Sequence, residues 1–203
     1  MYSVLPSFVL GFHGCDESVA EDVFSGRAEL KFSDNDYDWL GNGIYFWENN
    51  PVRALEFAKQ VKLFPQISRG KVKKAAVVGA IIDLGHCLNL LDSKFIEFLK
   101  FGYEVVAENI KQYDEPMPEN TPVKRDGDLL IRRLDCAVVE AVHEKQDWLV
   151  EKGKADYKFD TTRGVFIEGK EIYPNSGFRD KNHIQICVRN PACIKGYFRV
   201  RSE

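Results

Sequence analysis

The 203-residue chain is long enough for one domain with a buried core, and its 44% hydrophobic and 29% charged residues are typical of a globular protein, not a disordered one. A net charge of −3 argues against nucleic-acid binding through overall charge, and no apolar run approaches the roughly 20 residues of a transmembrane helix. Residues 1–6 show no signal peptide and the five cysteines form no C-x-x-C pair, so we expect a cytoplasmic protein with reduced thiols and no membrane contact. The four histidines lack ligand spacing, so we expect no metal site.

The first half of the chain alternates strand and helix patterns. Residues 8–13 are apolar nearly throughout and predict a buried strand, and residues 43–47 predict a second one. Residues 17–25 predict a helix with Asp16 as its N-cap and Gly26 as its stop. A further helix opens at residues 49–51, where Asn50 can cap the helix and Pro51 suits its first turn.

The second half predicts a buried strand over residues 74–84, two long helices over residues 92–112 and 129–146, and short strands over residues 163–168, 182–188 and 194–200. The second long helix is expected to begin near Asp126 or Asp128, after a proline-rich loop at residues 116–122. No linker or repeat divides the chain. We therefore expect a single α+β domain over residues 1–203, with a helical insertion at about 92–146 packed onto a β core.

Charge is unevenly distributed. Residues 51–74 carry seven basic side chains against one acid, residues 178–203 carry six against two, and residues 16–38 carry eight acids against two basic residues. Basic stretches are usually solvated faces, but they can also form a footprint for a polyanionic acceptor. Both interpretations stay open at this point.

Two motifs carry most of the functional information. Gly11-Phe12-His13-Gly14 ends an apolar run, and Trp39-Leu40-Gly41-Asn42-Gly43-Ile44-Tyr45-Phe46 follows about thirty residues later. Gly41 and Gly43 permit a tight turn into the strand that carries Tyr45. Together the motifs suggest two neighbouring strands of one ligand cleft.

These two motifs resemble the first two of the ADP-ribosyltransferase superfamily, in its His-Tyr-Glu branch, which includes diphtheria toxin and the poly(ADP-ribose) polymerases. The resemblance covers about the first sixty and the last forty residues. It implies an ADP-ribosyltransferase-like fold with two bent antiparallel β-sheets that form a cleft for NAD, here a substrate. It also implies that His13 hydrogen-bonds the adenosine ribose and that the backbone of Gly14 holds the nicotinamide carboxamide. Tyr45 would stack on the nicotinamide ring, with Gly43 in the turn before it and Phe57 as the opposite wall.

The third motif departs from the family, which has a catalytic glutamate on a strand near the C-terminus. Counting back from the closing strand at residues 192–198 places Gln185 at that position. A neutral glutamine can hold a ribose hydroxyl but cannot act as a base, which suits a single transfer and not polymer elongation. Two alternatives remain: Glu168 supplies the carboxylate, or Gln185 is an ordinary strand residue facing a polar pocket.

A compact chain of this kind resembles the mono-ADP-ribosyltransferase toxins of bacterial toxin–antitoxin and phage-defence systems. We expect ADP-ribose transfer to a macromolecule, with RNA or DNA favoured over protein, and an antitoxin partner. The loop before the third motif supports nucleic acid weakly, since it contains Tyr173, Phe178, Arg179 and Lys181. The alternatives are an NAD glycohydrolase and a catalytically inactive module that binds NAD or ADP-ribose.

Overall fold

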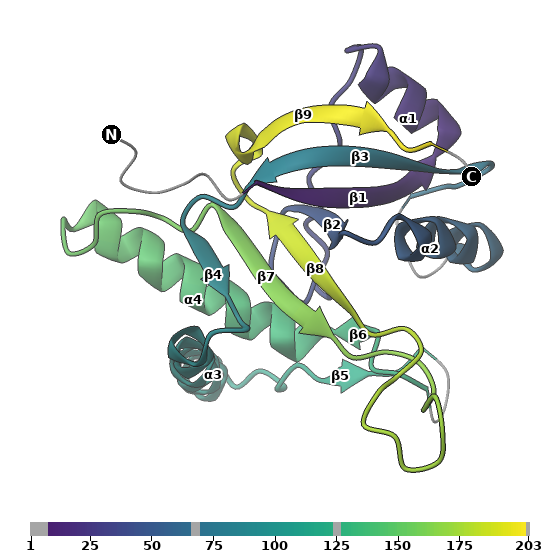
Figure 1. Ribbon diagram of the computed structural model, residues 1–203. Helices are drawn as coiled ribbons and strands as arrows, with labels where there is room; N and C mark the ends of the chain where they lie inside the picture. The colour runs from purple at the N-terminus through teal and green to yellow at the C-terminus, as the bar shows by residue number, and fades with distance from the viewer. Residues whose placement is uncertain (1–7, 66–69, 124–126, 202–203) are drawn as a thin grey trace.

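The computed structural model describes residues 8–65, 70–123 and 127–201 and shows a mixed α/β protein with four α-helices and a large mixed sheet (Figure 1). The expectations for residues 1–6, for Arg69 in the basic stretch and for a helix start at Asp126 fall outside the described residues. No helix in the described ranges is long and apolar enough to cross a membrane.

The large sheet has seven strands in the order β4-β7-β8-β2-β1-β3-β9. Their bounds are β1 (Phe8–Asp16), β2 (Ile44–Glu48), β3 (Ala75–Asp83), β4 (Cys87–Asn89), β7 (Thr161–Phe166), β8 (His183–Val188) and β9 (Ile194–Arg199). The β4–β7 pair is parallel, and the other neighbours in this sheet are antiparallel. Two short strands, β5 (Asn120–Thr121) and β6 (Ile131–Arg132), form a separate antiparallel pair.

This pairing corrects the expectation of two separate antiparallel sheets. Hydrogen bonds join all seven strands, but β1 and β2 share just two register pairs, Gly11 with Glu48 and Phe12 with Trp47. We call this short pairing the junction. Figure 1 shows β1, β3 and β9 running across the view and β7 and β8 running diagonally, so the sheet turns sharply at the junction.

The four helices are α1 (Glu17–Phe24), α2 (Pro51–Leu63), α3 (Ser93–Tyr113) and α4 (Arg133–Glu151). The predicted N-caps Asp16 and Asn50 are confirmed, since their side chains accept hydrogen bonds from the backbone N–H groups of Ser18 and Arg53. Asp92 caps α3 in the same way.

Helix α4 differs from the prediction, which placed its start near Asp126 or Asp128 and its end at residue 146. Residues 131–132 pair with β5 instead, and Asn120 Oδ1 accepts the backbone N–H groups of Leu134 and Asp135, which fixes the helix start at Arg133. The predicted loop at 116–122 therefore contains a strand. The sequence also missed β4, whose three residues are too short for a periodic signal.

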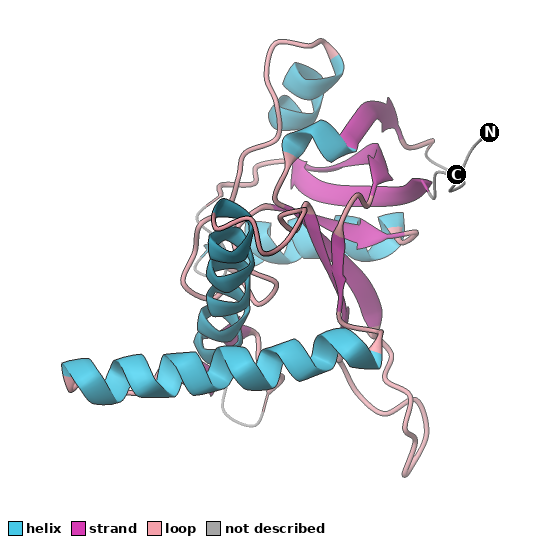
Figure 2. Ribbon diagram, turned by 90° about the vertical axis from the view of Figure 1, so that its left-hand side faces the viewer, coloured by secondary structure: helices cyan, strands magenta, loops and turns pink. Residues whose placement is uncertain are grey.

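Two of the four apolar clusters among the described residues show how the helices pack on the sheet. The larger one packs α1 against the sheet around Phe46, Val78 and Ile186, which are all fully buried. The smaller one lies beneath α3 and α4 around Leu88 and Phe159. Figure 2 shows the two long helices crossing, and Gly102 permits their close approach because a Cβ there would meet Val138 O at 2.5 Å.

Candidate functional site

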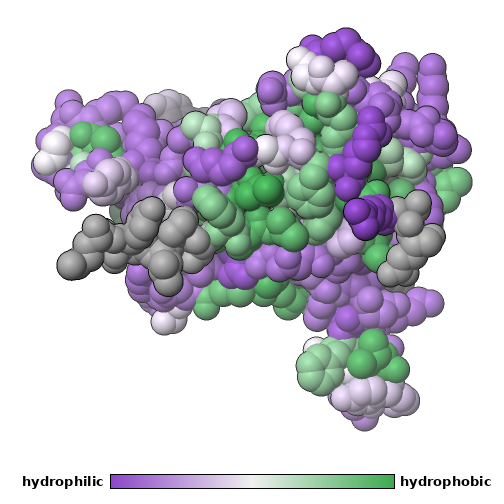
Figure 3. All heavy atoms as spheres, turned by 45° about the horizontal axis from the view of Figure 1, so that its top comes forward, coloured by the Kyte–Doolittle hydropathy of each residue, from purple (hydrophilic) through white to green (hydrophobic). Residues whose placement is uncertain are grey.

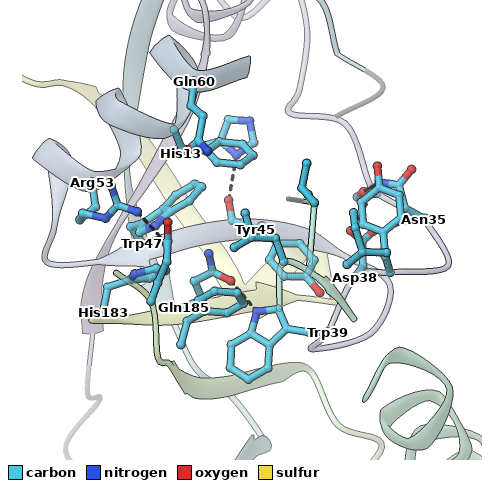
Figure 4. Close-up of a pocket in the computed structure, with 18 of the residues that line it drawn as sticks. His13, Asn35, Asp38, Trp39, Tyr45, Trp47, Arg53, Gln60, His183 and Gln185 are labelled. Carbon is cyan, nitrogen blue, oxygen red and sulfur yellow. Dashed lines mark hydrogen bonds and ion pairs between the residues drawn. The ribbon is translucent and has the colours of Figure 1, made fainter. Parts of the chain in front are cut away.

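A cavity of about 210 Å³ lies where α2, β1, β2, β7 and β8 meet, and the loop before β2 completes its wall (Figure 4). Ligand sites that bury a drug-sized molecule enclose about 300–1,000 Å³, so this cavity fits a ring with its sugar better than a whole dinucleotide. Four predicted site residues line it together with the alternative carboxylate; they are His13, Tyr45, Phe57, Gln185 and Glu168. Residues separated by up to 172 positions in the sequence thus meet at one cavity.

His13 is held as a neutral acceptor. Its Nδ1 lies 2.8 Å from the carbonyl oxygen of Tyr45. A carbonyl can only accept, so Nδ1 carries the hydrogen and Nε2 is left with a lone pair. Burial lowers the pKa of His13, against the opposing effect of the bond to Tyr45. The unprotonated Nε2 of the neutral imidazole can accept a hydrogen bond from a sugar hydroxyl.

Gly14 lies on the stretch of β1 that extends past the junction. The carbonyl of Leu10 accepts the N–H of Asn49, so Leu10 points its backbone groups toward β2. Alternation along an antiparallel strand gives Gly14 the same direction, and the register with β2 ends at Phe12. Within the described part of the chain, no β2 residue pairs with Gly14, but Gly14 itself is not among the residues that line the cavity.

Gly14 also has a steric role, which predicts the effect of Gly14→Ala. A Cβ there would lie 2.0 Å from the carbonyl oxygen of Ala54 in α2. Because backbone must move, we expect a loss of about 1–3 kcal/mol in the free energy of unfolding, measured by urea titration. Gly196→Ala is the matched control, since a Cβ there meets nothing within 4 Å and should change stability by less than about 0.5 kcal/mol. Equal effects of the two substitutions would contradict this role for Gly14.

Tyr45 offers its aromatic ring, and not its hydroxyl, to a ligand in the cavity. The hydroxyl donates to Gly41 O at 2.8 Å and accepts from Leu40 N at 2.9 Å, so it is committed to the turn that precedes β2. Burial raises the pKa of Tyr45 well above its ordinary value. Gly43 does not line the cavity; a Cβ there would lie 2.4 Å from Cys187 Sγ, so this glycine lets the turn pack on β8.

Gln185 is buried, and its Oε1 accepts a hydrogen bond of 2.6 Å from Trp39 Nε1. Figure 4 shows the amide nitrogen on the side away from Trp39. Trp39 lies over Gly164, where a Cβ would approach its ring at 2.7 Å. The glutamine therefore offers N–H donors to the cavity, while one lone pair of its oxygen is already used.

Glu168 is the buried carboxylate of the cavity. Its Oε2 accepts from Arg53 Nη2 at 2.8 Å, and Lys181 Nζ lies 3.9 Å from its Oε1. Burial raises the pKa of Glu168, against the opposing charges of Arg53 and Lys181. Arg53 also pairs with Glu56, so two guanidinium nitrogens are occupied by carboxylates. The sequence suggested Glu168 as an alternative but missed Arg53, whose partner is 115 positions away.

His183, Trp47 and Phe166 form an aromatic wall that sequence reasoning also missed. The His183 ring stacks on Phe166 with centroids 5.4 Å apart and lies 6.0 Å from Trp47. Trp47 in turn contacts Phe57 at 4.9 Å. The alternation of β8 could have revealed His183, because it lies two residues before Gln185 and so shares its face.

The loop before β2 closes the opposite end of the cavity with polar groups. Asn35 is buried, and its Oδ1 has no hydrogen-bond partner among the described residues. Burial raises the pKa of the nearby Asp38, against hydrogen bonds from Ser33 and Asn35. This end can accept hydrogen bonds from amino or hydroxyl groups of a ligand.

Comparisons with known proteins add little to this geometry. No family model matches the chain, and no solved structure matches it. An uncharacterized protein of Methanocaldococcus jannaschii, MJ0359, is 22% identical over 204 residues, which cover 91% of this chain and 83% of that protein. The chain is therefore similar over nearly its full length to an archaeal protein whose name states no activity.

Proposed function

We propose that the chain is a mono-ADP-ribosyltransferase of the ADP-ribosyltransferase-like fold, which takes NAD as its substrate and transfers ADP-ribose to a macromolecule, with nucleic acid favoured over protein. In this reaction the bond between nicotinamide and ribose C1′ breaks, nicotinamide leaves, a nucleophile of the acceptor bonds to C1′ and its proton is released. The main support is the convergence of His13, Tyr45, Phe57 and Gln185 on one cavity.

The local chemistry of each residue agrees with its proposed role. The bare Nε2 of His13 can accept from a ribose hydroxyl, and the backbone groups of Gly14, which pair with no described β2 residue, can bond a carboxamide. The ring of Tyr45 is available for stacking because its hydroxyl is held in the turn. Positioning of this kind supplies much of the rate in reactions that pass through an oxocarbenium-like sugar.

A carboxylate near the reacting sugar would stabilise the developing positive charge. Gln185 cannot do so, and Glu168 lies at the same cavity, although it is paired with Arg53. We therefore assign charge stabilisation to Glu168 and ribose positioning to Gln185.

A second candidate is a module that binds NAD or ADP-ribose without turnover. One observation favours it: the oxygen of Gln185 already accepts from Trp39, so the third position of the trio has neither a charge nor a fully free acceptor. An NAD glycohydrolase, with water as the acceptor, is the remaining alternative.

Incubation with radiolabelled NAD separates these functions. The purified chain is given total RNA, DNA or a protein extract, and we expect label on nucleic acid together with free nicotinamide. His13→Ala should reduce labelling by about 10²-fold or more, whereas His86→Ala, which removes a ring stacked on Phe159 outside the cavity, should not. Free ADP-ribose without labelled acceptor would indicate a glycohydrolase, and NAD binding without turnover would indicate the binding module.

An unregulated transferase would harm the cell that makes it, so the proposal includes a neutralising antitoxin. The cellular readout of the same experiment is growth arrest on expression of the chain. The His13→Ala variant is expected to be harmless.

A further inference from the structure

Four buried polar atoms of the cavity have no hydrogen-bond partner within the described residues, and three of them lie at the end opposite Asn35. These three are Trp47 Nε1, Arg53 Nε and His183 Nε2, and their side chains belong to residues that are 4%, 8% and 7% exposed. All three residues line the cavity, and Figure 4 shows them grouped at one end. Buried polar groups are nearly always paired in folded proteins, so three unpaired atoms in one place indicate a site built for a polar ligand.

The donor and acceptor character of these atoms is fixed. The indole Nε1 and the guanidinium Nε can only donate. His183 Nδ1 lies 2.7 Å from the carbonyl of Lys181, so Nδ1 carries the hydrogen and Nε2 can only accept while the ring is neutral. Burial lowers the pKa of His183 to about 4, with Arg53 and Arg132 acting in the same direction, which keeps the ring neutral at pH 7. The end of the cavity formed by Trp47, Arg53 and His183, the inner subsite, therefore offers two donors and one acceptor.

Strand register places the inner subsite beyond the reacting end of the NAD. Tyr45 pairs with Cys187, and the next pair of side chains on that face of the sheet is Trp47 with Gln185. His183 precedes Gln185 by two residues on β8, so it comes next along the same face. Under the proposed function, nicotinamide stacks on Tyr45 and the ribose contacts Gln185. His183 then lies on the far side of Gln185 from Tyr45, next to the loop of residues 167–182, where an acceptor can enter.

The ligand must supply two acceptors and one donor, and the packed rings of Trp47, His183 and Phe166 beside these atoms favour a flat ligand. Uracil and thymine provide O2 and O4 on either side of N3–H, and cytosine provides O2 and N3 beside its amino group. The same edge of guanine has one acceptor and two donors, and that of adenine has one of each.

We propose that the inner subsite binds an unpaired pyrimidine base of the acceptor nucleic acid. That this nucleic acid is the acceptor of ADP-ribose depends on the proposed function. That the subsite recognises a pyrimidine base depends only on the unpaired atoms of Trp47, Arg53 and His183.

The surface next to the inner subsite fits the phosphates of such a strand. A groove between the loop of residues 167–182 and residues 127–132 carries Arg132, Lys170, Arg179 and Lys181. Its three carboxylates, Asp128, Asp180 and Glu171, accept backbone N–H groups of the same loop, from Gly169, Lys170 and Asn175. Beyond the groove, the loop exposes Tyr173 and Phe178, and Figure 3 shows apolar atoms at the tip of the protrusion at lower right. Cations with exposed aromatic rings suit single-stranded nucleic acid.

The test uses the natural chain and labelled single strands that are abasic except for one central base. Fluorescence anisotropy without NAD should show U or C binding about tenfold or more tightly than G and than the fully abasic strand. Equal binding of all strands, or a preference for G, would overturn the inference. This comparison requires no variant and so does not depend on whether one folds.

Variants then assign the preference to the inner subsite. Trp47→Phe and His183→Phe keep an aromatic ring, remove the unpaired nitrogen and should lower the pyrimidine advantage by about tenfold each. Trp148→Phe, on the exposed side of α4, is the matched control and should leave it unchanged. If the two variants instead weaken nicotinamide binding and leave the base preference intact, the subsite holds the carboxamide and the inference is wrong.

NAD cleavage by the same preparations separates the two proposals. If NAD is cleaved, protein is labelled and the strands show no pyrimidine preference, the inference is overturned and the proposed transferase activity still holds. A pyrimidine preference without NAD cleavage would support the inner subsite and overturn the proposed reaction.

Discussion

Acidification from pH 7 to pH 4 is expected to remove about 6 kcal/mol of folding free energy through two buried histidines, His143 and His183. Burial lowers the pKa of His143 to about 3 and that of His183 to about 4, against an ordinary value of 6.5. Both rings bind a proton in the unfolded chain at a higher pH than in the folded one. Their stabilisation is therefore complete above pH 6.5 and is lost as the pH falls through the folded pKa values.

Other groups change this profile in a known direction. Burial also lowers the pKa of His13, which adds to the loss. Burial raises the pKa values of Glu168 and Asp38, so each of these two stabilises the fold on acidification and offsets part of the loss. Asp16 has a lowered pKa because backbone N–H groups bond its carboxylate, and it contributes a loss only below about pH 4. We therefore expect a net loss of stability between pH 6.5 and pH 4, the interval in which His143 and His183 are protonated in the unfolded chain and mostly neutral in the folded one.

Urea titrations between pH 7 and pH 4 measure this effect, and His143→Leu identifies its source. His143 Nε2 bonds Thr162 Oγ1, so the variant starts less stable at pH 7. It should nevertheless lose about 3 kcal/mol less than the natural chain over the same interval. Parallel stability curves for the two proteins would show that His143 does not titrate in this way.

The substitution Arg53→Met is expected to cost about 3–5 kcal/mol, because it leaves Glu168 buried without its closest partner. The charge of Lys181, 3.9 Å away, compensates in part. The loss should grow as the pH rises, since burial raises the pKa of Glu168 in the folded chain and the uncompensated charge appears when this carboxyl ionises.

A double variant tests whether the cost comes from the unpaired charge. Replacing the pair by apolar side chains in Arg53→Met with Glu168→Leu removes both charges and should recover most of the lost stability. Urea titrations of both single variants and the double variant give the coupling between the residues. Strictly additive losses would mean that the ion pair is not what stabilises this end of the cavity.

Local signals in the sequence predicted much of the fold. The caps Asp16 and Asn50 and the helix start after Asp92 depend on residues within one turn, and the strands that include His13, Tyr45 and Gln185 have apolar runs of sufficient length. The start of α4 was wrong because its cap, Asn120, lies on another segment. Strand β4 was missed because three residues carry no period.

In the candidate site, too, the sequence predicted the residues that belong to local motifs and missed the contacts between distant segments. The two motifs predicted that His13 and Tyr45 lie together, and the two residues meet through a direct hydrogen bond. The bond from Trp39 to Gln185 spans 146 positions and the ion pair from Arg53 to Glu168 spans 115, and neither leaves a local pattern. The structure is therefore needed to find which polar atoms of the cavity remain unpaired.

The short junction between β1 and β2 has a mechanical consequence. His13 and Gly14 belong to the half of the sheet with β3 and β9, whereas Tyr45 and Gln185 belong to the half with β7 and β8. With two register pairs at the junction, the halves can twist against each other while few backbone hydrogen bonds change. The contact of α2 with Gly14 and the hydrogen bond between His13 and Tyr45 then limit the width of the cleft. A molecule bound to both halves would restrict this twisting motion of the sheet.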